Sequence, residues 1–210
     1  MTIVQRGYAL FLLLVAVSFA GCGPGFQAGA DVAQGRQALF RGDYGTALSS
    51  FQSAAQADPN YVYGTELREG VLSYLGRAQY LNGQLPAAQK TLQQSLAVHK
   101  SNNLTRLYLG LTLAREGDRK TAAGDIQKGL RGMGHLINYI VNAFSDSFGS
   151  FWDQNGSLRK SIAANEALVA SPNIDWSTLI ANCETLAINY EQVEDIATQD
   201  QAQFEEMNRP

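Results

Sequence analysis

The residues that most often carry out catalysis are few in this sequence. Its two histidines, His99 and His135, belong to no H-E-x-x-H pattern, and its two cysteines, Cys22 and Cys183, form no C-x-x-C pair. The sequence contains no G-x-x-x-x-G-K-[ST] phosphate loop, and its carboxylates are scattered over predicted helix surfaces. We therefore expect no catalytic site, no metal and no cofactor, and we do not expect an enzyme.

The surroundings of Cys22 predict a modification. An apolar run from Ala9 to Phe19 follows the single charge of Arg6 and ends in the sequence FAGC. The run is too short to cross the ~30 Å hydrocarbon layer as a helix, and its length is typical of a signal peptide. Small residues directly before a cysteine resemble the bacterial lipobox, in which the cysteine receives a diacylglyceryl group and becomes the first mature residue.

This resemblance implies a signal peptide over residues 1–21, lipid attachment at Cys22 and a flexible, glycine-rich tether over residues 22–30. Gly23, where some lipoproteins have Asp, fits sorting to the outer membrane, so we expect an anchored protein that faces the periplasm. The alternative is an ordinary secretory signal that is cut just before Cys22 and leaves a free thiol.

Three segments of the chain share a pattern of small and apolar residues. Each has a first Gly, a second Gly seven residues later, an Ala five residues after that and a large apolar residue four further on. The segments contain Gly35, Gly42, Ala47 and Phe51; Gly76, Gly83, Ala88 and Leu92; and Gly110, Gly117, Ala122 and Ile126. We expect each first Gly where two helices pack closely and each second Gly in the turn between them.

Gly83 and Gly117 lie 34 residues apart, and with the small residues this spacing resembles the tetratricopeptide repeat. The resemblance implies an all-α fold with a short solenoid of about three helical hairpins over residues 31–133. Helices that pack on the end of the solenoid are expected over residues 134–210, with one beginning near Leu136. The longer spacing before the second unit is expected to be a loop or helix extension around the sequence NYVYGTEL.

In the tetratricopeptide family the first helix of each hairpin lines a concave face that binds peptides. By position, the resemblance implies a peptide-binding groove formed by Val32, Arg36, Phe40, Ser73, Arg77, Tyr80, Leu107, Leu111 and Arg115. Arg36 and Arg77 fall at equivalent positions, where a guanidinium can pair with carboxylates or stack on aromatic rings. The alternative is that these arginines are solvated or pair within the chain. The Lys/Asn carboxylate clamp of chaperone-binding relatives is not matched.

The last predicted helix combines an apolar stripe with an acidic outer face. Its acids, with no Lys or Arg among them, are Glu184, Glu191, Glu194, Asp195, Asp200, Glu205 and Glu206. We favour a solvated acidic face. Docking of this helix on the third repeat, where residues 100–131 hold seven basic and three acidic residues, is the alternative. Cys183 falls on the apolar stripe, so we expect a buried thiol.

The net charge of −3 argues against nucleic-acid binding. We expect a membrane-anchored lipoprotein that acts as a protein-binding scaffold or adaptor in cell-envelope assembly, with an envelope protein or peptide as its partner. The alternative is a structural lipoprotein whose C-terminal helices self-associate into a homo-oligomer.

Overall fold

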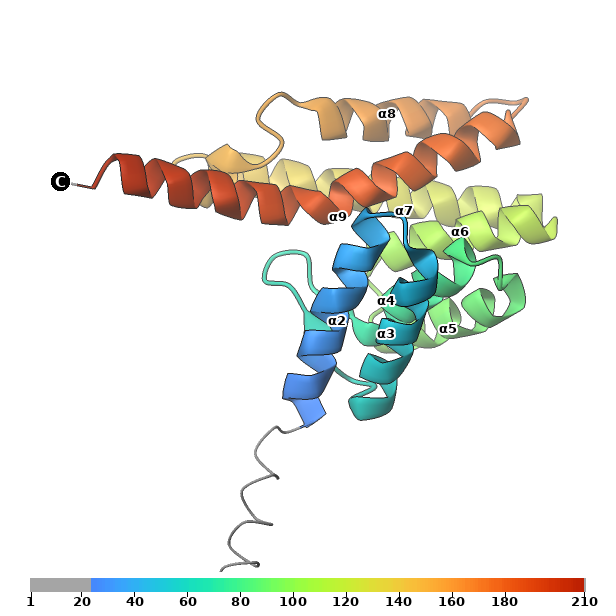
Figure 1. Ribbon diagram of the computed structural model, residues 1–210. Helices are drawn as coiled ribbons and strands as arrows, with labels where there is room; N and C mark the ends of the chain where they lie inside the picture. Colours follow the sequence, from blue (N-terminus) through green and yellow to red (C-terminus); the bar gives the residue numbers. More distant parts are fainter. Residues whose placement is uncertain (1–23, 210) are drawn as a thin grey trace, which may run out of the picture.

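Helical hairpins make up residues 24–143, and a short 3₁₀ helix, a further α-helix and a long C-terminal helix follow them (Figure 1). The computed structural model describes residues 24–209, so the expected signal peptide and Cys22 lie outside the described residues. The elements are α2 (Pro24–Phe40), α3 (Tyr44–Ala57), β1 (Val62–Tyr63), β2 (Glu69–Gly70), α4 (Val71–Leu81), α5 (Leu85–Val98), α6 (Asn103–Glu116), α7 (Arg119–Ala143), the 3₁₀ helix η1 (Phe148–Phe151), α8 (Ser157–Val169) and α9 (Trp176–Met207). The all-α prediction is confirmed, apart from the two-residue strands β1 and β2, which pair antiparallel.

The glycines predicted at helix contacts lie there. A Cβ atom added to any of them would come within 2.5–2.7 Å of a side chain on the second helix of the same hairpin. The pairs are Gly35 with Phe51, Gly76 with Leu92, and Gly110 with Ile126. Because any larger residue would force the two helices apart, these positions set how closely each hairpin closes.

The second glycine of each unit lies in the turn between the two helices. Gly42, Gly83 and Gly117 have φ angles of 75°, 73° and 100°. This left-handed conformation is unfavourable for residues with a Cβ but not for glycine. The structure therefore contains three helical hairpins, α2/α3, α4/α5 and α6/α7, with the turns at the predicted positions.

The expected flexible tether is wrong for the part of it that the structure describes. Helix α2 begins at Pro24, so residues 24–30 are helical. Ala28 and Val32 are fully buried in a cluster with Phe51 and Tyr74. Burial of this face against the first two hairpins favours the helix over an extended linker.

The expected boundary near residue 134 is also wrong. Helix α7 runs without a break from Arg119 to Ala143, and its buried residues continue from Leu130 through Met133 and Ile137 to Ile140. The second half of α7 therefore packs on α8 and η1 instead of forming a separate helix that begins at Leu136.

Helix α9 is the longest element and connects the two halves of the molecule. It lies across the ends of the hairpin helices, with α8 along its other side, and its last turns project past α2 (Figure 1). The apolar stripe contains Leu179, Cys183 and Leu186, each of them fully buried. Burial raises the pKa of the Cys183 thiol to about 12, with a further contribution from Glu184, and the predicted burial of this cysteine is confirmed.

Among the helices within residues 24–209, none is both long enough and apolar enough to cross a membrane.

Candidate functional site

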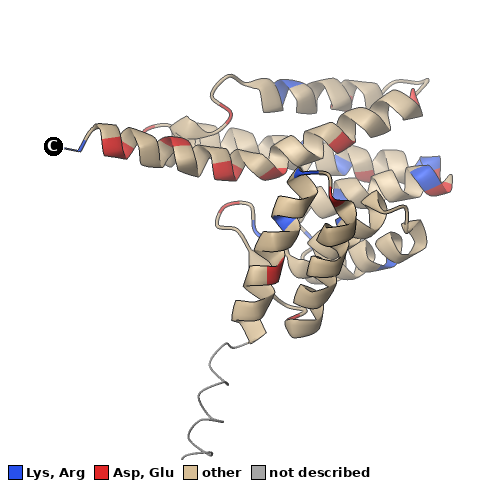
Figure 2. Ribbon diagram, viewed as in Figure 1, with Lys and Arg blue, Asp and Glu red and all other residues tan. Residues whose placement is uncertain are grey.

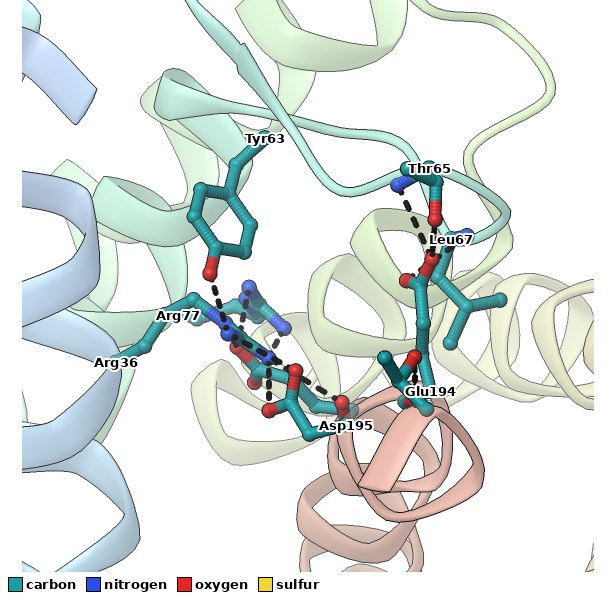
Figure 3. Close-up of polar contacts among 9 residues, drawn as sticks. Arg36, Tyr63, Thr65, Leu67, Arg77, Glu194 and Asp195 are labelled. Carbon is teal, nitrogen blue, oxygen red and sulfur yellow. Dashed lines mark hydrogen bonds and ion pairs between the residues drawn. The ribbon is translucent and has the colours of Figure 1, made fainter. Parts of the chain in front are cut away.

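Two arginines from successive hairpins bind one carboxylate on α9. Arg36 Nε lies 3.2 Å from Glu191 Oε1, and Arg77 Nη1 lies 2.9 Å from Glu191 Oε2. Arg36 Nη2 also contacts Asp195 Oδ2 at 2.8 Å (Figure 3). The two arginines occupy equivalent positions on α2 and α4, so the prediction that they face one surface is confirmed. The ligand that they hold is a helix of their own chain.

These ion pairs are buried. The side chains of Arg36, Arg77 and Glu191 are 8%, 1% and 8% exposed. Burial alone lowers the pKa of Arg77, but the charges of Glu191 and Glu69 outweigh it and raise that pKa above its usual value. The guanidinium of Arg77 lies 4.3 Å from the ring centroid of Tyr74. Both arginines are therefore charged, and each depends on its carboxylate to offset the loss of water.

The face of Arg36 lies against aromatic rings. Its guanidinium carbon is 4.6 Å from the ring centroid of Tyr63 and 5.3 Å from that of Phe40. Arg36 Nη1 also donates a hydrogen bond to Tyr63 Oη at 3.2 Å. Tyr63 comes from β1, so the segment between the first two hairpins helps to orient this arginine.

A second carboxylate, Glu69, lies beneath Arg77. Its Oε2 accepts hydrogen bonds from Ser73 Oγ at 2.6 Å and from Asn102 Nδ2 at 2.9 Å. Thr105 Oγ1 in turn donates to Ser73 Oγ at 2.6 Å. Burial is the main influence on the Glu69 carboxyl and raises its pKa, although Arg77 and these hydrogen bonds act in the opposite direction.

The segment between β1 and β2 holds a third acid of α9. Glu194 Oε1 accepts hydrogen bonds from the backbone N–H groups of Thr65 and Glu66 at 3.0 and 2.7 Å, and from the Thr65 hydroxyl. Glu194 Oε2 accepts a bond from the Leu67 N–H at 3.2 Å (Figure 3). The residues around NYVYGTEL, expected to be a loop or helix extension, thus form a small β-hairpin whose loop binds the carboxylate through its backbone.

The third hairpin contributes a more exposed contact. Glu184 accepts hydrogen bonds from the Tyr80 hydroxyl and from Arg115 Nη2. The Arg115 side chain is 38% exposed, and its guanidinium lies 4.5 Å from the centroid of the Tyr80 ring. The series of contacts along α9 therefore runs from deeply buried at Arg77 to half-exposed at Arg115.

The remaining predicted groove residues are buried or half-buried within the hairpin region. Val32, Leu107 and Leu111 are fully buried in the hydrophobic core, Ser73 is buried against Glu69, and Phe40 is half-buried beside Arg36. Leu107 and Leu111 share their core cluster with residues of α9 such as Leu186, whereas the cluster of Val32 contains none. Because α9 binds Arg36, Arg77 and Arg115, and none of the apolar groove residues is exposed, the expectation of a groove open to a partner peptide is corrected.

The preferred prediction of a solvated acidic face on α9 is wrong for its first four acids. Figure 2 shows acidic positions spaced along α9 and none that is basic. Glu184, Glu191, Glu194 and Asp195 all bind side chains or backbone of the hairpin region, and of the seven acids only the last two, Glu205 and Glu206, are exposed. The alternative, docking, occurs: the buried ion pairs are with Arg36 and Arg77, and a more exposed one joins Glu184 to Arg115 within the basic residues 100–131. The reason is that the two buried arginines need counter-charges.

The site residues that the sequence analysis missed are the acceptors: Glu69, Glu191, Glu194 and Asp195, together with Tyr63. One signal for them was present, since Glu184, Glu191 and Asp195 recur at helical spacing beside the apolar stripe of α9. Together, these arginines and carboxylates bind and orient helix α9.

Within residues 24–209, no three His, Cys, Asp or Glu side chains gather closely enough to hold a metal ion.

Scans against protein-family models, curated proteins and solved structures found no match to this chain.

Proposed function

We propose that this chain is a lipid-anchored scaffold or adaptor of the bacterial cell envelope, built on three hairpins of the tetratricopeptide type. The lipid anchor is inferred from the FAGC sequence that ends at Cys22. The repeat assignment is supported by the glycine pairs that close each hairpin and by the equivalent positions of Arg36 and Arg77. The proposed location is the periplasmic face of the outer membrane.

The observation that carries the adaptor function is an exposed apolar surface at the outer end of α9. Ile196, Phe204 and Met207 recur at helical spacing and are 52%, 53% and 78% exposed. The ring of Phe204 lies 5.7 Å from that of Phe151, at the edge of a cleft of about 480 Å³ between α8 and α9. Exposed apolar side chains that gather beside a cleft are typical of a protein-binding surface.

The face of the hairpins that binds α9 through Arg36, Arg77 and Arg115, called the concave face below, has a supporting role in this proposal. Glu191 and Asp195 fix α9 against the first two hairpins, and Ile196 follows directly in the chain. The buried ion pairs therefore determine where the apolar end of α9 is presented. The partner is an envelope protein that binds the outer end of α9, not a peptide that enters the filled groove.

Self-association is the second candidate function, and the same surface favours it. A second copy of the chain could cover Phe204 and Met207, which would make the protein a structural oligomer. The two functions differ in the identity of the molecule that contacts this surface.

Photo-crosslinking in cells separates these functions. A benzoylphenylalanine placed at Phe204 is expected to crosslink to a different envelope protein if the chain is an adaptor, and to a second copy if it is an oligomer. Val98, which is 63% exposed at the end of α5, provides a matched control position. Equal crosslinking from both positions, or none from Phe204, would contradict the proposed surface.

A further inference from the structure

A second cleft opens on another side of α9. It has a volume of about 420 Å³ and lies between the β1–β2 hairpin, the turn from α5 to α6, and α9. Its apolar walls include Leu67, Leu104 and Leu136, and its polar walls include Glu69, His99 and Tyr190. The volume and the mixture of apolar walls with a few polar groups are typical of small-molecule sites. The proposed adaptor function does not use this cleft.

The cleft shares its inner wall with a small cavity beside the Arg36–Glu191 ion pair. Leu67, Glu69, Leu104 and Tyr190 line both spaces. The inner cavity has a volume of about 10 Å³, close to the lower limit for a single water molecule. A ligand in the cleft would therefore meet Glu69 and Tyr190 directly, while the ion pair behind them stays covered.

Two polar atoms on this shared wall lack a hydrogen bond. Both bonds to Glu69 end on Oε2, and no side chain or backbone group of residues 24–209 donates to Oε1. Tyr190 is 3% exposed, and its hydroxyl forms no hydrogen bond within the same range. Both residues line the cleft. The wall thus offers two acceptor atoms to a ligand that donates hydrogen bonds.

The charge around this wall favours a cation. Three carboxylates, those of Glu69, Glu191 and Glu194, line the inner cavity, against the single guanidinium of Arg36. At the rim of the cleft, the exposed Glu66 and Arg68 offset each other. Burial raises the pKa of Glu69 even though the charge of Arg77 acts in the opposite direction, so a bound cation would add to a compensation that is incomplete.

We propose that this cleft binds a small primary amine. The ammonium group donates hydrogen bonds to Glu69 Oε1 and Tyr190 Oη, and the apolar chain of the ligand lies against Leu104 and Leu136. Three N–H donors on one compact charge fit the two acceptors better than a quaternary ammonium, which has none.

The test is calorimetric titration of the full chain with n-butylammonium chloride at constant chloride concentration. We expect saturable binding. Glu69→Gln should weaken it at least about tenfold, because a charge-assisted hydrogen bond is lost. The Gln oxygen can still accept from Ser73 and Asn102, so this variant should fold. Tyr190→Phe should weaken binding by a smaller factor, and Glu205→Gln, at an exposed position that does not line the cleft, should leave it unchanged.

Three further ligands complete the test. Butyltrimethylammonium and butyrate should not bind, since one lacks donors and the other carries the wrong charge. Nα-acetyl-lysine methylamide stands for a lysine side chain of a protein, and tighter binding of this compound than of n-butylammonium would overturn the assignment to a small amine. The proposal is also overturned if n-butylammonium gives no saturable binding, or binds the wild type and Glu69→Gln equally. These outcomes are independent of any crosslink formed at Phe204.

Discussion

The inside of each hairpin and the concave face that α9 covers are both buried, but they are built from opposite kinds of residue. Within the hairpins, glycines such as Gly110 receive apolar side chains such as Ile126 with no charge at the contact. On the concave face, Arg36 and Arg77 are buried against Glu191. Apolar contacts add directly to stability. A buried ion pair roughly balances its own desolvation, but it strongly disfavours any arrangement that separates the partners. The hairpin contacts therefore hold the fold together, whereas the ion pairs specify where α9 lies.

Removal of the shared carboxylate should have the largest effect. Glu191→Ala leaves Arg77 without its paired carboxylate and Arg36 with Asp195 alone, and breaking a buried ion pair typically costs about 3–5 kcal/mol. Urea denaturation followed by circular dichroism measures the loss. Glu205→Ala, at an exposed position on the same helix, is the matched control and should change the free energy of unfolding by less than about 0.5 kcal/mol.

Replacing the whole ion-paired group with apolar residues should reverse most of that loss. In the variant with Arg36→Met, Arg77→Met and Glu191→Leu, no charge of the triad is left buried and unpaired. Glu69 loses the charge of Arg77, but it can take up a proton because burial already raises its pKa. Asp195, whose side chain is 40% exposed, can then turn to water. If the triple variant is no more stable than Glu191→Ala, the effect of Glu191 does not come from unpaired buried charge.

A methyl group in the hairpin contact should have the next largest effect. A Cβ at residue 110 would lie 2.7 Å from Ile126 Cγ1 and 2.8 Å from the backbone N of the same residue. Because the backbone cannot move aside, Gly110→Ala should destabilise the protein by about 1–3 kcal/mol. Gly124 lies in helix α7 with no atom within 4 Å of its added Cβ, so Gly124→Ala should instead stabilise by about 0.5–1 kcal/mol. Equal effects at the two positions would contradict the close helix contact.

The pH dependence of stability should report on Glu69. Burial raises the pKa of this carboxyl in the folded state above its ordinary value of 4.5. The folded protein therefore holds this proton more tightly than the unfolded chain does, and the associated stability is present below pH 4.5 and is lost as the pH rises. Glu69→Gln should remove this dependence, so its stability relative to wild type should increase from pH 4.5 upward. If the difference in unfolding free energy between Glu69→Gln and the wild type is constant across the pH range, Glu69 has the same pKa in the folded and unfolded states.

The smallest effect is expected at the exposed end of the concave face. Arg115 and Glu184 have side chains that are 38% and 24% exposed, and exposed ion pairs contribute about 0–1 kcal/mol. Arg115→Ala should lose less than about 1 kcal/mol, and 1 M NaCl should reduce that loss further. A loss as large as that of Glu191→Ala would mean that burial does not govern the strength of these contacts.

The hairpins could be predicted because their signals are local. The first glycine, the turn glycine, the alanine and the apolar residue of each unit lie within 17 residues of one another, as in Gly35 to Phe51. The first glycine allows close approach of the two helices, the turn glycine adopts a positive φ, and the alanine and the apolar residue are buried. The spacing of these residues along the chain therefore specifies both helices and the turn that joins them.

The position of α9 could not be predicted in the same way. Arg36 and Glu191 are 155 residues apart, and the number of acids in a helix does not say which of them face the protein. The regular return of Glu184, Glu191 and Asp195 beside the apolar stripe is a pattern that solvated helices also show. The contact of Glu194 with the β1–β2 loop is less predictable still, because its donors are backbone groups of residues 65–67.

The central claim is that α9 is held in the concave face through the buried carboxylate of Glu191. The most direct measurement is a double-mutant cycle of Arg77→Met and Glu191→Leu, with the free energy of unfolding measured by urea denaturation for the wild type, both single variants and the double variant. The structure predicts a coupling energy of about 2–3 kcal/mol between the two sites, in the upper part of the range of about 0.5–3 kcal/mol found for residues in direct contact. A coupling below about 0.5 kcal/mol, as for distant independent residues, would contradict the claim.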